Sequence, residues 1–306
     1  MIWIAAAIVA AAGLGAWSER RRPERASALA RRALSLVLYV LLPPIVFVNL
    51  AEIEFDFGLG VGLLLGVLTV ALVGLSAWLV AGPVFGLPRP VVGAVVCCSV
   101  VANTGYLGYP LVLTLMGSDD LSQGVAWDAV VSDVALTLFA FGAGAAFGTT
   151  AGEGFRQRLK AFFLRNPVLY AAILGLLVPG SVIPDFLVEI SWVRVALVLP
   201  IGFFAIGVVI EEEVRSRGSF WPPRPARAVG IVALARLVVA PSLLFLLSVP
   251  FTGIPPSFYL MAAMPAGINS MIVGHAYGLD LRTTAWSILA TTAIVVTGAL
   301  VWTVLA

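Results

Sequence analysis

The sequence predicts an all-α integral membrane protein, and three observations lead to this fold class. Hydrophobic residues make up 61% of the 306-residue chain and charged residues 11%, whereas roughly a quarter of a soluble domain is charged. The mean hydropathy is +1.06. The apolar residues also gather into runs long enough to cross a bilayer, separated by short polar loops. We therefore expect most of the chain to lie in lipid, and we expect no nucleic-acid partner.

Ten such apolar runs follow one another along the chain. Each is expected to form one transmembrane helix, although the sixth is short and ends in Pro-Gly. The predicted spans are Ile2–Trp17, Ala33–Leu50, Phe57–Ala81, Val91–Met116, Val125–Phe147, Pro167–Pro179, Val193–Ile210, Ala228–Val249, Phe258–Tyr277 and Thr283–Leu305.

The first run could also be read as the apolar core of a secretory signal peptide. Its basic cluster, Arg20, Arg21, Arg22 and Arg25, follows the apolar residues. A signal peptide has the opposite order, with the basic residues first. We therefore predict that Ile2–Trp17 is the first membrane span.

The basic residues orient the spans. Apart from Arg194 and Arg236, every Lys and Arg lies in alternate loops, and acidic residues dominate the loops between them. Loops rich in Lys and Arg remain on the cytoplasmic side of a membrane. This pattern predicts a multi-pass protein with both termini outside, and we expect the membrane to be the prokaryotic cell membrane.

Ten spans divide into two halves of five, and an odd number means that the second half enters the membrane from the opposite side. Three short motifs recur in the same order in both halves. "PIVF" at Pro44 is followed by "PIGF" at Pro200, "NTGYLGY" at Asn103 by "NSMIVGH" at Asn269, and "AWDAVVSD" at Ala126 by "AWSILATT" at Ala285. We predict two inverted five-helix repeats, residues 1–149 and 167–306, joined by a cytoplasmic connection at 150–166.

Helix breakers interrupt the fourth and ninth spans near their middles. Broken helices at matching repeat positions are the usual location of a transporter's binding site, and the free N–H groups of a half-helix favour an anion. Asn103, Thr104, Asn269 and Ser270 add neutral hydrogen-bond donors at this depth. The alternative is that these small residues only allow tight helix packing. The candidate substrate-binding residues are Asn103, Thr104, Gly105, Gly108, Pro110, Pro265, Asn269 and Ser270.

Ionisable residues inside spans are candidates for ion coupling, because an unpaired charge in lipid is expensive. Asp133 and Arg236 both lie about 13 Å into their spans, at 1.5 Å per residue. They are expected either to form a structural ion pair or to carry a proton and contact substrate. Asp128 is predicted nearer the outer surface, as a vestibule group or a solvated one. His275 is either a proton relay or an interfacial side chain.

Several of these segments resemble the auxin efflux carrier family, which includes plant auxin carriers and bacterial organic-acid transporters. "VVANTGYLGYPLVLTLMG" is similar to that family's fourth span and "AAMPAGINSMIVGHAYGLD" to its ninth. The resemblance implies crossed broken helices four and nine and a homodimer. It also implies a panel domain of helices 1, 2, 6 and 7 beside a moving core of helices 3–5 and 8–10. The fold is related to bile-acid sodium symporters, but their sodium-binding Glu has no counterpart in span nine here.

These properties predict a secondary active transporter of small organic anions that works by alternating access. Its partners would be the anion, the lipid bilayer, and protons rather than sodium, with the proton gradient or the membrane potential as the energy source. The alternatives are a sodium-coupled symporter of bile-acid type and a membrane scaffold or sensor that does not transport. Nothing in the sequence indicates an enzyme, a metal site or a cofactor; Cys97 and Cys98 are adjacent and are expected to be buried apolar side chains.

Overall fold

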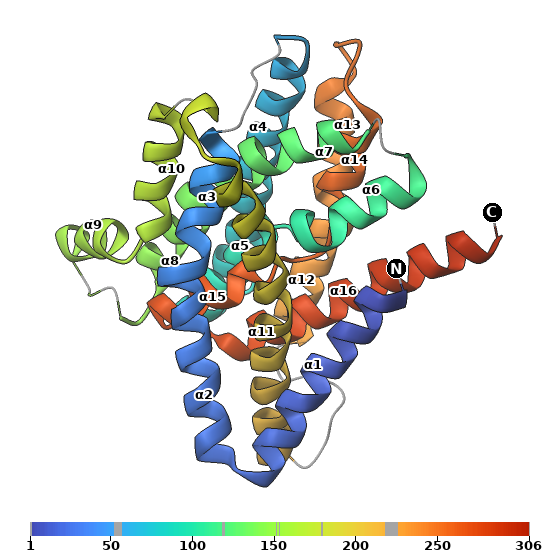
Figure 1. The fold of residues 1–306 in the computed structure, drawn as a ribbon. Coiled ribbons are helices and arrows are strands. Elements are labelled where there is room, and N and C mark those ends of the chain that lie inside the picture. Colours follow the sequence, from blue (N-terminus) through green and yellow to red (C-terminus); the bar gives the residue numbers. More distant parts are fainter. Residues whose placement is uncertain are drawn as a thin grey trace.

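The structure, a computed structural model, describes residues 2–51, 57–117, 120–150, 152, 154–178, 180–217 and 226–305. Within these ranges the chain is helical, and Figure 1 shows a bundle of helices that cross one another at several angles. The α-helices are α1 (Ile2–Arg21), α2 (Pro23–Leu36), α3 (Leu42–Ala51), α4 (Phe57–Leu79), α5 (Arg89–Val100), α6 (Tyr109–Leu115), α7 (Leu121–Trp127), α8 (Phe141–Phe147), α9 (Phe155–Leu164), α10 (Pro167–Leu177), α11 (Asp185–Arg217), α12 (Ala226–Leu234), α13 (Ala240–Ser248), α14 (Pro256–Ala262), α15 (Asn269–Tyr277) and α16 (Leu281–Leu305).

Short turns of different pitch join several of these helices. A 3₁₀ turn, η6 (Gly180–Val182), precedes α11. The others are π-helical: η1 (Val37–Leu41), η2 (Val80–Val84), η3 (Thr104–Gly108), η4 (Asp128–Ser132), η5 (Ala135–Ala140) and η7 (Ala235–Val239). A π turn inside a helix rotates the residues after it and is common at functional sites.

The predicted all-helical membrane class agrees with the structure. Five helices of the described residues are long and apolar enough to cross a membrane, and a sixth span results if α9 and α10, bent by 61°, are counted together. The helices α5, α6, α14 and α15 are each too short to cross alone, because spans four and nine are interrupted. The ten-span inverted repeat therefore stays a prediction.

Glycines allow the closest helix contacts. Helix α1 packs along α11, where a Cβ atom added at Gly207 would lie 2.0 Å from the carbonyl oxygen of Ala12. Helix α10 packs on α3 in a similar way, with Gly175 against the backbone of Phe47. Small residues let membrane helices approach to backbone contact, which supplies packing energy that lipid cannot.

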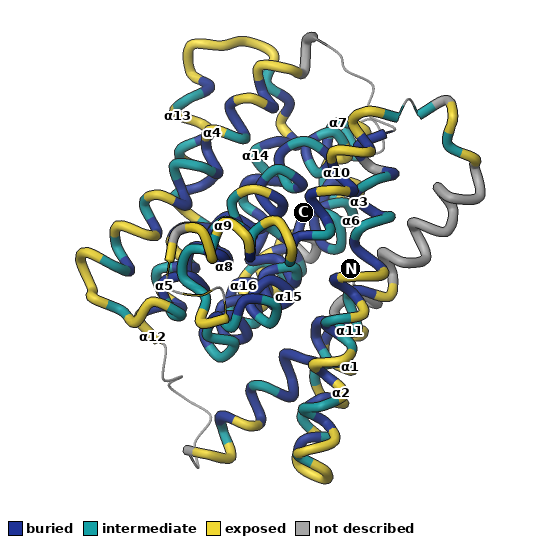
Figure 2. The backbone as a smooth tube through the Cα atoms, turned by 90° about the vertical axis from the view of Figure 1, so that its left-hand side faces the viewer, coloured by how far each residue is buried: buried dark blue, intermediate teal, exposed yellow. Residues whose placement is uncertain are grey.

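The buried residues of the bundle include an unusual number of polar ones. Figure 2 shows the dark, buried stretches gathered in the interior around α5, α14 and α15, with exposed stretches at the periphery. The buried polar side chains of α5, α15 and α16 include Ser99, Ser270, Thr283, Thr284, Ser287, Thr291 and Thr292. In lipid the outward faces are apolar, so polar groups collect inside the protein, next to the two broken spans.

Candidate functional site

The two predicted helix breaks lie against each other. Helix α5 ends at Val100 and α14 ends at Ala262, and the chain is helical again from Thr104 and from Asn269. Between these ends the two strands of backbone form an antiparallel bridge, Ala102 opposite Ala266. The Asn103 N–H donates to the Pro265 carbonyl at 2.8 Å, and the Gly267 N–H donates to the Val101 carbonyl at 2.9 Å. Each break therefore satisfies the backbone polar groups of the other, as non-helical backbone inside a membrane requires.

Gly267 is required by this contact. A Cβ atom at position 267 would lie 2.6 Å from the carbonyl oxygen of Ala102, which is backbone and has no freedom to rotate away. The neighbouring Ala266 N–H is satisfied by the Thr291 hydroxyl of α16, at 3.1 Å. The bridge is thus held from both sides, and helix α16 fixes the position of the second break.

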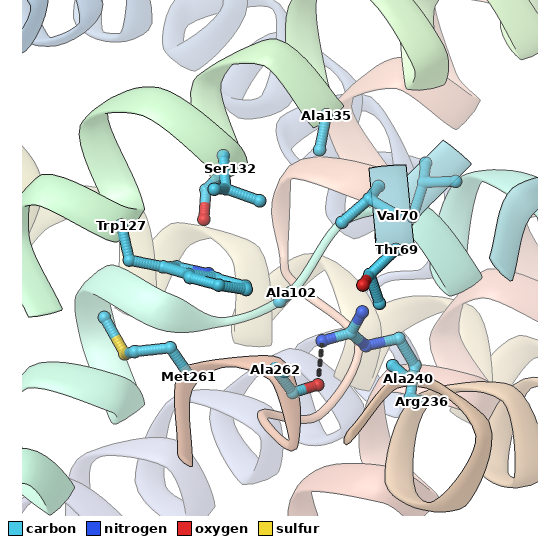
Figure 3. Close-up of a pocket in the computed structure, with 12 residues that line it drawn as sticks. Thr69, Val70, Ala102, Trp127, Ser132, Ala135, Arg236, Ala240, Met261 and Ala262 are labelled. Atoms are coloured by element: carbon cyan, nitrogen blue, oxygen red, sulfur yellow. Dashed lines mark hydrogen bonds between the residues drawn. The ribbon is translucent and has the colours of Figure 1, made fainter. Parts of the chain in front are cut away.

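Arg236 of η7 binds the helix ends that stop at the breaks. Its side chain is 1% exposed. The guanidinium donates to Met264 O at 3.1 and 3.0 Å, to Ala262 O at 3.0 Å and to Ser99 O at 3.3 Å. Figure 3 shows the bond to Ala262. The last carbonyls of a helix have no partner within the helix and carry partial negative charge. Arg236 therefore neutralises the carboxyl ends of both α5 and α14.

These contacts correct the prediction of an Asp133–Arg236 ion pair. Arg20–Glu211, at 2.6 Å, and Arg215–Glu19, at 2.7 Å, are ion pairs, and neither involves Arg236. The depth of the two side chains in the membrane was predicted from the helical rise alone. Depth does not fix the direction in which a side chain points. The guanidinium of Arg236 turns to backbone carbonyls.

The two asparagines at the breaks differ from their neighbours in having unused amide groups. Asn103 is 2% exposed, and neither Oδ1 nor Nδ2 of its side chain has a hydrogen-bond partner among the described residues. Asn269 is half-buried, and its Oδ1 also has no such partner. Buried amides are almost always paired, so each exception requires an explanation such as a ligand or a water molecule.

The hydroxyl groups that follow the asparagines are already occupied. Thr104 donates to the Asp128 carboxylate and lies 2.9 Å from the Ser132 hydroxyl. Ser270 donates to the Cys97 carbonyl at 3.3 Å. In this conformation the amides of Asn103 and Asn269 are the more available groups for a ligand.

Asp128 lies at the first break. Both of its carboxylate oxygens accept hydrogen bonds, Oδ1 from Thr104 and Oδ2 from Tyr109 Oη at 2.7 Å. A Cβ atom at Gly105 would be 3.4 Å from Oδ2, so the absence of a side chain there leaves the carboxylate room. The sequence predicted either a vestibule group or a solvated one for Asp128. It did not identify Tyr109 or Ser132, since no spacing along the chain relates span four to span five.

The other predicted residues lie around the breaks or away from them. Gly108 packs against Met261 of α14, and Pro110 lies in the first turn of α6, directly after η3. His275 is farther along α15, with Nε2 at 3.1 Å from the Ser35 hydroxyl of α2. His275 therefore marks a contact between α15 and α2.

A small cavity lies beside the bridge (Figure 3). Its lining includes Thr69, Ala102, Ser132, Arg236 and Met261, and its volume is about 10 Å³. The Thr69 hydroxyl is buried without a hydrogen-bond partner among the described residues. A cavity of this size holds about one water molecule, so it is too small for an organic anion.

Comparisons with known proteins agree with the sequence-based resemblance. A family model described as "Membrane transport protein" matches residues 4–148, just under half of the chain. A protein of the archaeon Methanocaldococcus jannaschii named as an uncharacterized transporter is 25% identical over 270 residues, which are 84% of this chain and 83% of the relative. These two matches confirm the predicted resemblance to the auxin efflux carrier type of membrane transport family.

Proposed function

We propose that the chain is a secondary transporter of small organic anions, working by alternating access around the two breaks. The observation that carries this proposal is a pair of asparagines where the broken helices meet. Neither amide atom of the Asn103 side chain, nor Oδ1 of Asn269, has a hydrogen-bond partner among the described residues. The family match and the transporter-named relative support the transport function in general.

The charge distribution at the breaks favours an anion over a cation. Arg236 neutralises the carboxyl ends of α5 and α14. The amino ends of the following segments, which begin at Thr104 and Asn269, keep their partial positive charge. An anion held by the amides would complete this arrangement. A sodium ion would compete with the guanidinium for the same carbonyl oxygens, so we propose proton coupling or the membrane potential rather than sodium.

Among the predicted coupling residues we propose Asp128 as the proton-binding group. Its carboxylate hydrogen-bonds Thr104, the residue next to Asn103, and no ion pair of the described residues includes it. A carboxylate substrate at Asn103 would be repelled by ionised Asp128 and not by the protonated acid. Anion affinity should therefore increase as the pH falls. Asp133 and His275 remain secondary candidates.

Alternating access is the mode of transport that we propose around the two breaks. The cavity beside the bridge, at about 10 Å³, is too small for an organic anion, so binding one there would require the helices to separate. We propose that a core containing α4–α8 and α12–α16 moves against a panel containing α1–α3, α10 and α11. The basic loops would lie on the cytoplasmic side of a prokaryotic cell membrane, with both termini outside and with the panel forming a homodimer.

Binding to the purified protein tests this function. Calorimetric titrations with mono- and dicarboxylates, with and without sodium, are made between pH 5 and 8 on the wild type and on Asp128→Asn. We expect carboxylate binding that weakens as the pH rises in the wild type, that is independent of pH in the variant, and that does not change with sodium.

The same titrations separate the alternatives. Sodium-dependent binding would indicate the bile-acid type of symporter. Absence of binding by any carboxylate, together with an unchanged melting temperature, would favour a scaffold or sensor. If binding is equally pH-dependent in Asp128→Asn, anion transport remains supported, but the proton binds to a group other than Asp128.

A further inference from the structure

Helix α9 (Phe155–Leu164) is amphipathic and does not continue the span that follows it. Its axis is bent by 61° from that of α10. In Figure 1 it lies crosswise at the edge of the bundle, next to the ends of α8 and α10. A basic helix in this position, next to membrane spans and across them, suits the interface between lipid head groups and acyl chains.

The inner face of α9 is bound to the end of α15. The buried Tyr277 hydroxyl donates to the Ala161 carbonyl at 3.1 Å and lies within 3.4 Å of the Phe162 carbonyl. Arg165, directly after the helix, donates to the Ala276 carbonyl at 3.3 Å. Helix α15 begins with Asn269, so α9 is attached to the opposite end of the segment that starts at the proposed anion site.

The outer face of α9 combines exposed apolar and basic residues. Leu159 is 45% exposed and Phe163 44%. Arg156 and Lys160 are also exposed, and no ion pair or hydrogen bond of the described residues uses either side chain. The positions 156, 159, 160 and 163 are spaced by three and four residues, which places them on one face of a helix.

We propose that this face of α9 binds anionic phospholipid at the cytoplasmic membrane surface. Leu159 and Phe163 would enter the acyl region, while Arg156 and Lys160 would contact the phosphate and the negative head group. Neither cation is paired with another of the described residues, and their charge is complementary to an anionic lipid and not to a zwitterionic one. A basic side chain near an anionic bilayer contributes roughly fivefold in affinity, so two contribute on the order of 25-fold.

The lipid contact has a consequence at the other end of α15. Anionic lipid would hold α9, and through Tyr277 it would hold α15 and Asn269. Carboxylate affinity should then depend on anionic lipid. This second part rests on the proposed transport function, whereas lipid binding itself does not.

The experiment uses the full-length protein in nanodiscs of phosphatidylcholine with increasing phosphatidylglycerol, and it measures bound phosphatidylglycerol by native mass spectrometry after release. The test variant is Arg156→Gln with Lys160→Gln. The matched control is Arg22→Gln with Arg25→Gln, which removes the same charge from exposed positions at the α1–α2 turn. We expect phosphatidylglycerol binding to weaken about 25-fold in the test variant only. Equal loss in both variants, or no loss in either, would overturn the proposal.

Two further arms identify the ligand and the link to the site. If inorganic phosphate or glycerol phosphate protects the protein against heat as well as phosphatidylglycerol does, the basic pair is a site for soluble phosphate and the lipid proposal is wrong. Tyr277→Phe should retain phosphatidylglycerol binding and lose the effect of that lipid on carboxylate affinity. A protein that binds phosphatidylglycerol selectively and binds no carboxylate would contradict the transport function and leave the lipid site intact.

Discussion

The two helix breaks have similar sequences and different surroundings. At the first break Asn103 is 2% exposed, and the next residue, Thr104, is bonded to a carboxylate that also accepts from Tyr109. At the second break Asn269 is half-buried, and the Ser270 hydroxyl donates to the backbone carbonyl of Cys97. The first break therefore has a carboxylate among its side-chain contacts, while the second is held by Arg236, by the Thr291 hydroxyl and by backbone bonds.

The similar motifs alone would assign the same role to both breaks. The difference in their surroundings instead suggests that one break binds the anion and the other fixes the position of the site. If the anion contacts both asparagines, the first break supplies the stronger contact and the dependence on pH. The second break holds the first break in place, because Gly267 contacts the first break and Thr291 fixes Ala266. The following predictions test this assignment, beginning with the largest expected effect.

Replacement of Arg236 should affect both breaks together. Arg236→Leu leaves the carbonyls of Ser99, Ala262 and Met264 without their donor, and we expect a loss of roughly 3–5 kcal/mol in the free energy of unfolding. Unfolding in detergent measures the loss, with the exposed Arg227→Leu as control. Because Arg236 binds carbonyls and not Asp133, adding Asp133→Asn should not restore stability. If the double variant regains stability, Arg236 and Asp133 form an ion pair after all, and the contacts described here are wrong.

Added methyl groups should distinguish the breaks. In Gly267→Ala the new Cβ atom meets the Ala102 carbonyl at 2.6 Å, so the bridge must open, at a cost of roughly 1–3 kcal/mol. In Gly105→Ala the nearest atom is Asp128 Oδ2 at 3.4 Å, which needs only a small adjustment. Melting temperatures of the two variants should show a clear decrease for Gly267→Ala and a minor one for Gly105→Ala. The reverse order would mean that the breaks do not meet as described.

Asn103→Ala should weaken the binding of every carboxylate substrate by about one to two orders of magnitude, since a hydrogen bond to a charged group is worth roughly 1.5–3 kcal/mol. The amide has no partner within the described protein, so the melting temperature of the free protein should stay nearly unchanged. Calorimetry beside thermal melting measures both. Loss of stability with intact affinity would show that Asn103 serves packing and not binding.

Asn269→Ala should have the smallest effect. Its side chain is less buried than that of Asn103, so removing it should cost roughly 1 kcal/mol, or about fivefold in affinity. The same titrations measure it beside Asn103→Ala, and the double variant shows whether the two amides act on one ligand. An effect as large as that of Asn103→Ala would make the breaks equivalent, and unchanged affinity in both single variants would rule out the proposed site.

The sequence alone determined the membrane class, the family resemblance and the positions of the helix breaks. These are local properties: hydropathy follows from composition, and Gly, Pro and Asn interrupt a helix where they stand. It also placed Asn103 and Asn269 at matching positions of two repeats, although the repeat itself remains a prediction. Only the tertiary structure showed that the breaks pair with each other, that Arg236 binds helix ends and that Asp128 accompanies Thr104. The helical rise fixes how deep a residue lies, whereas the rotation of a helix about its axis, which selects the partner, is decided by packing among all the helices and by π turns such as η4 and η7.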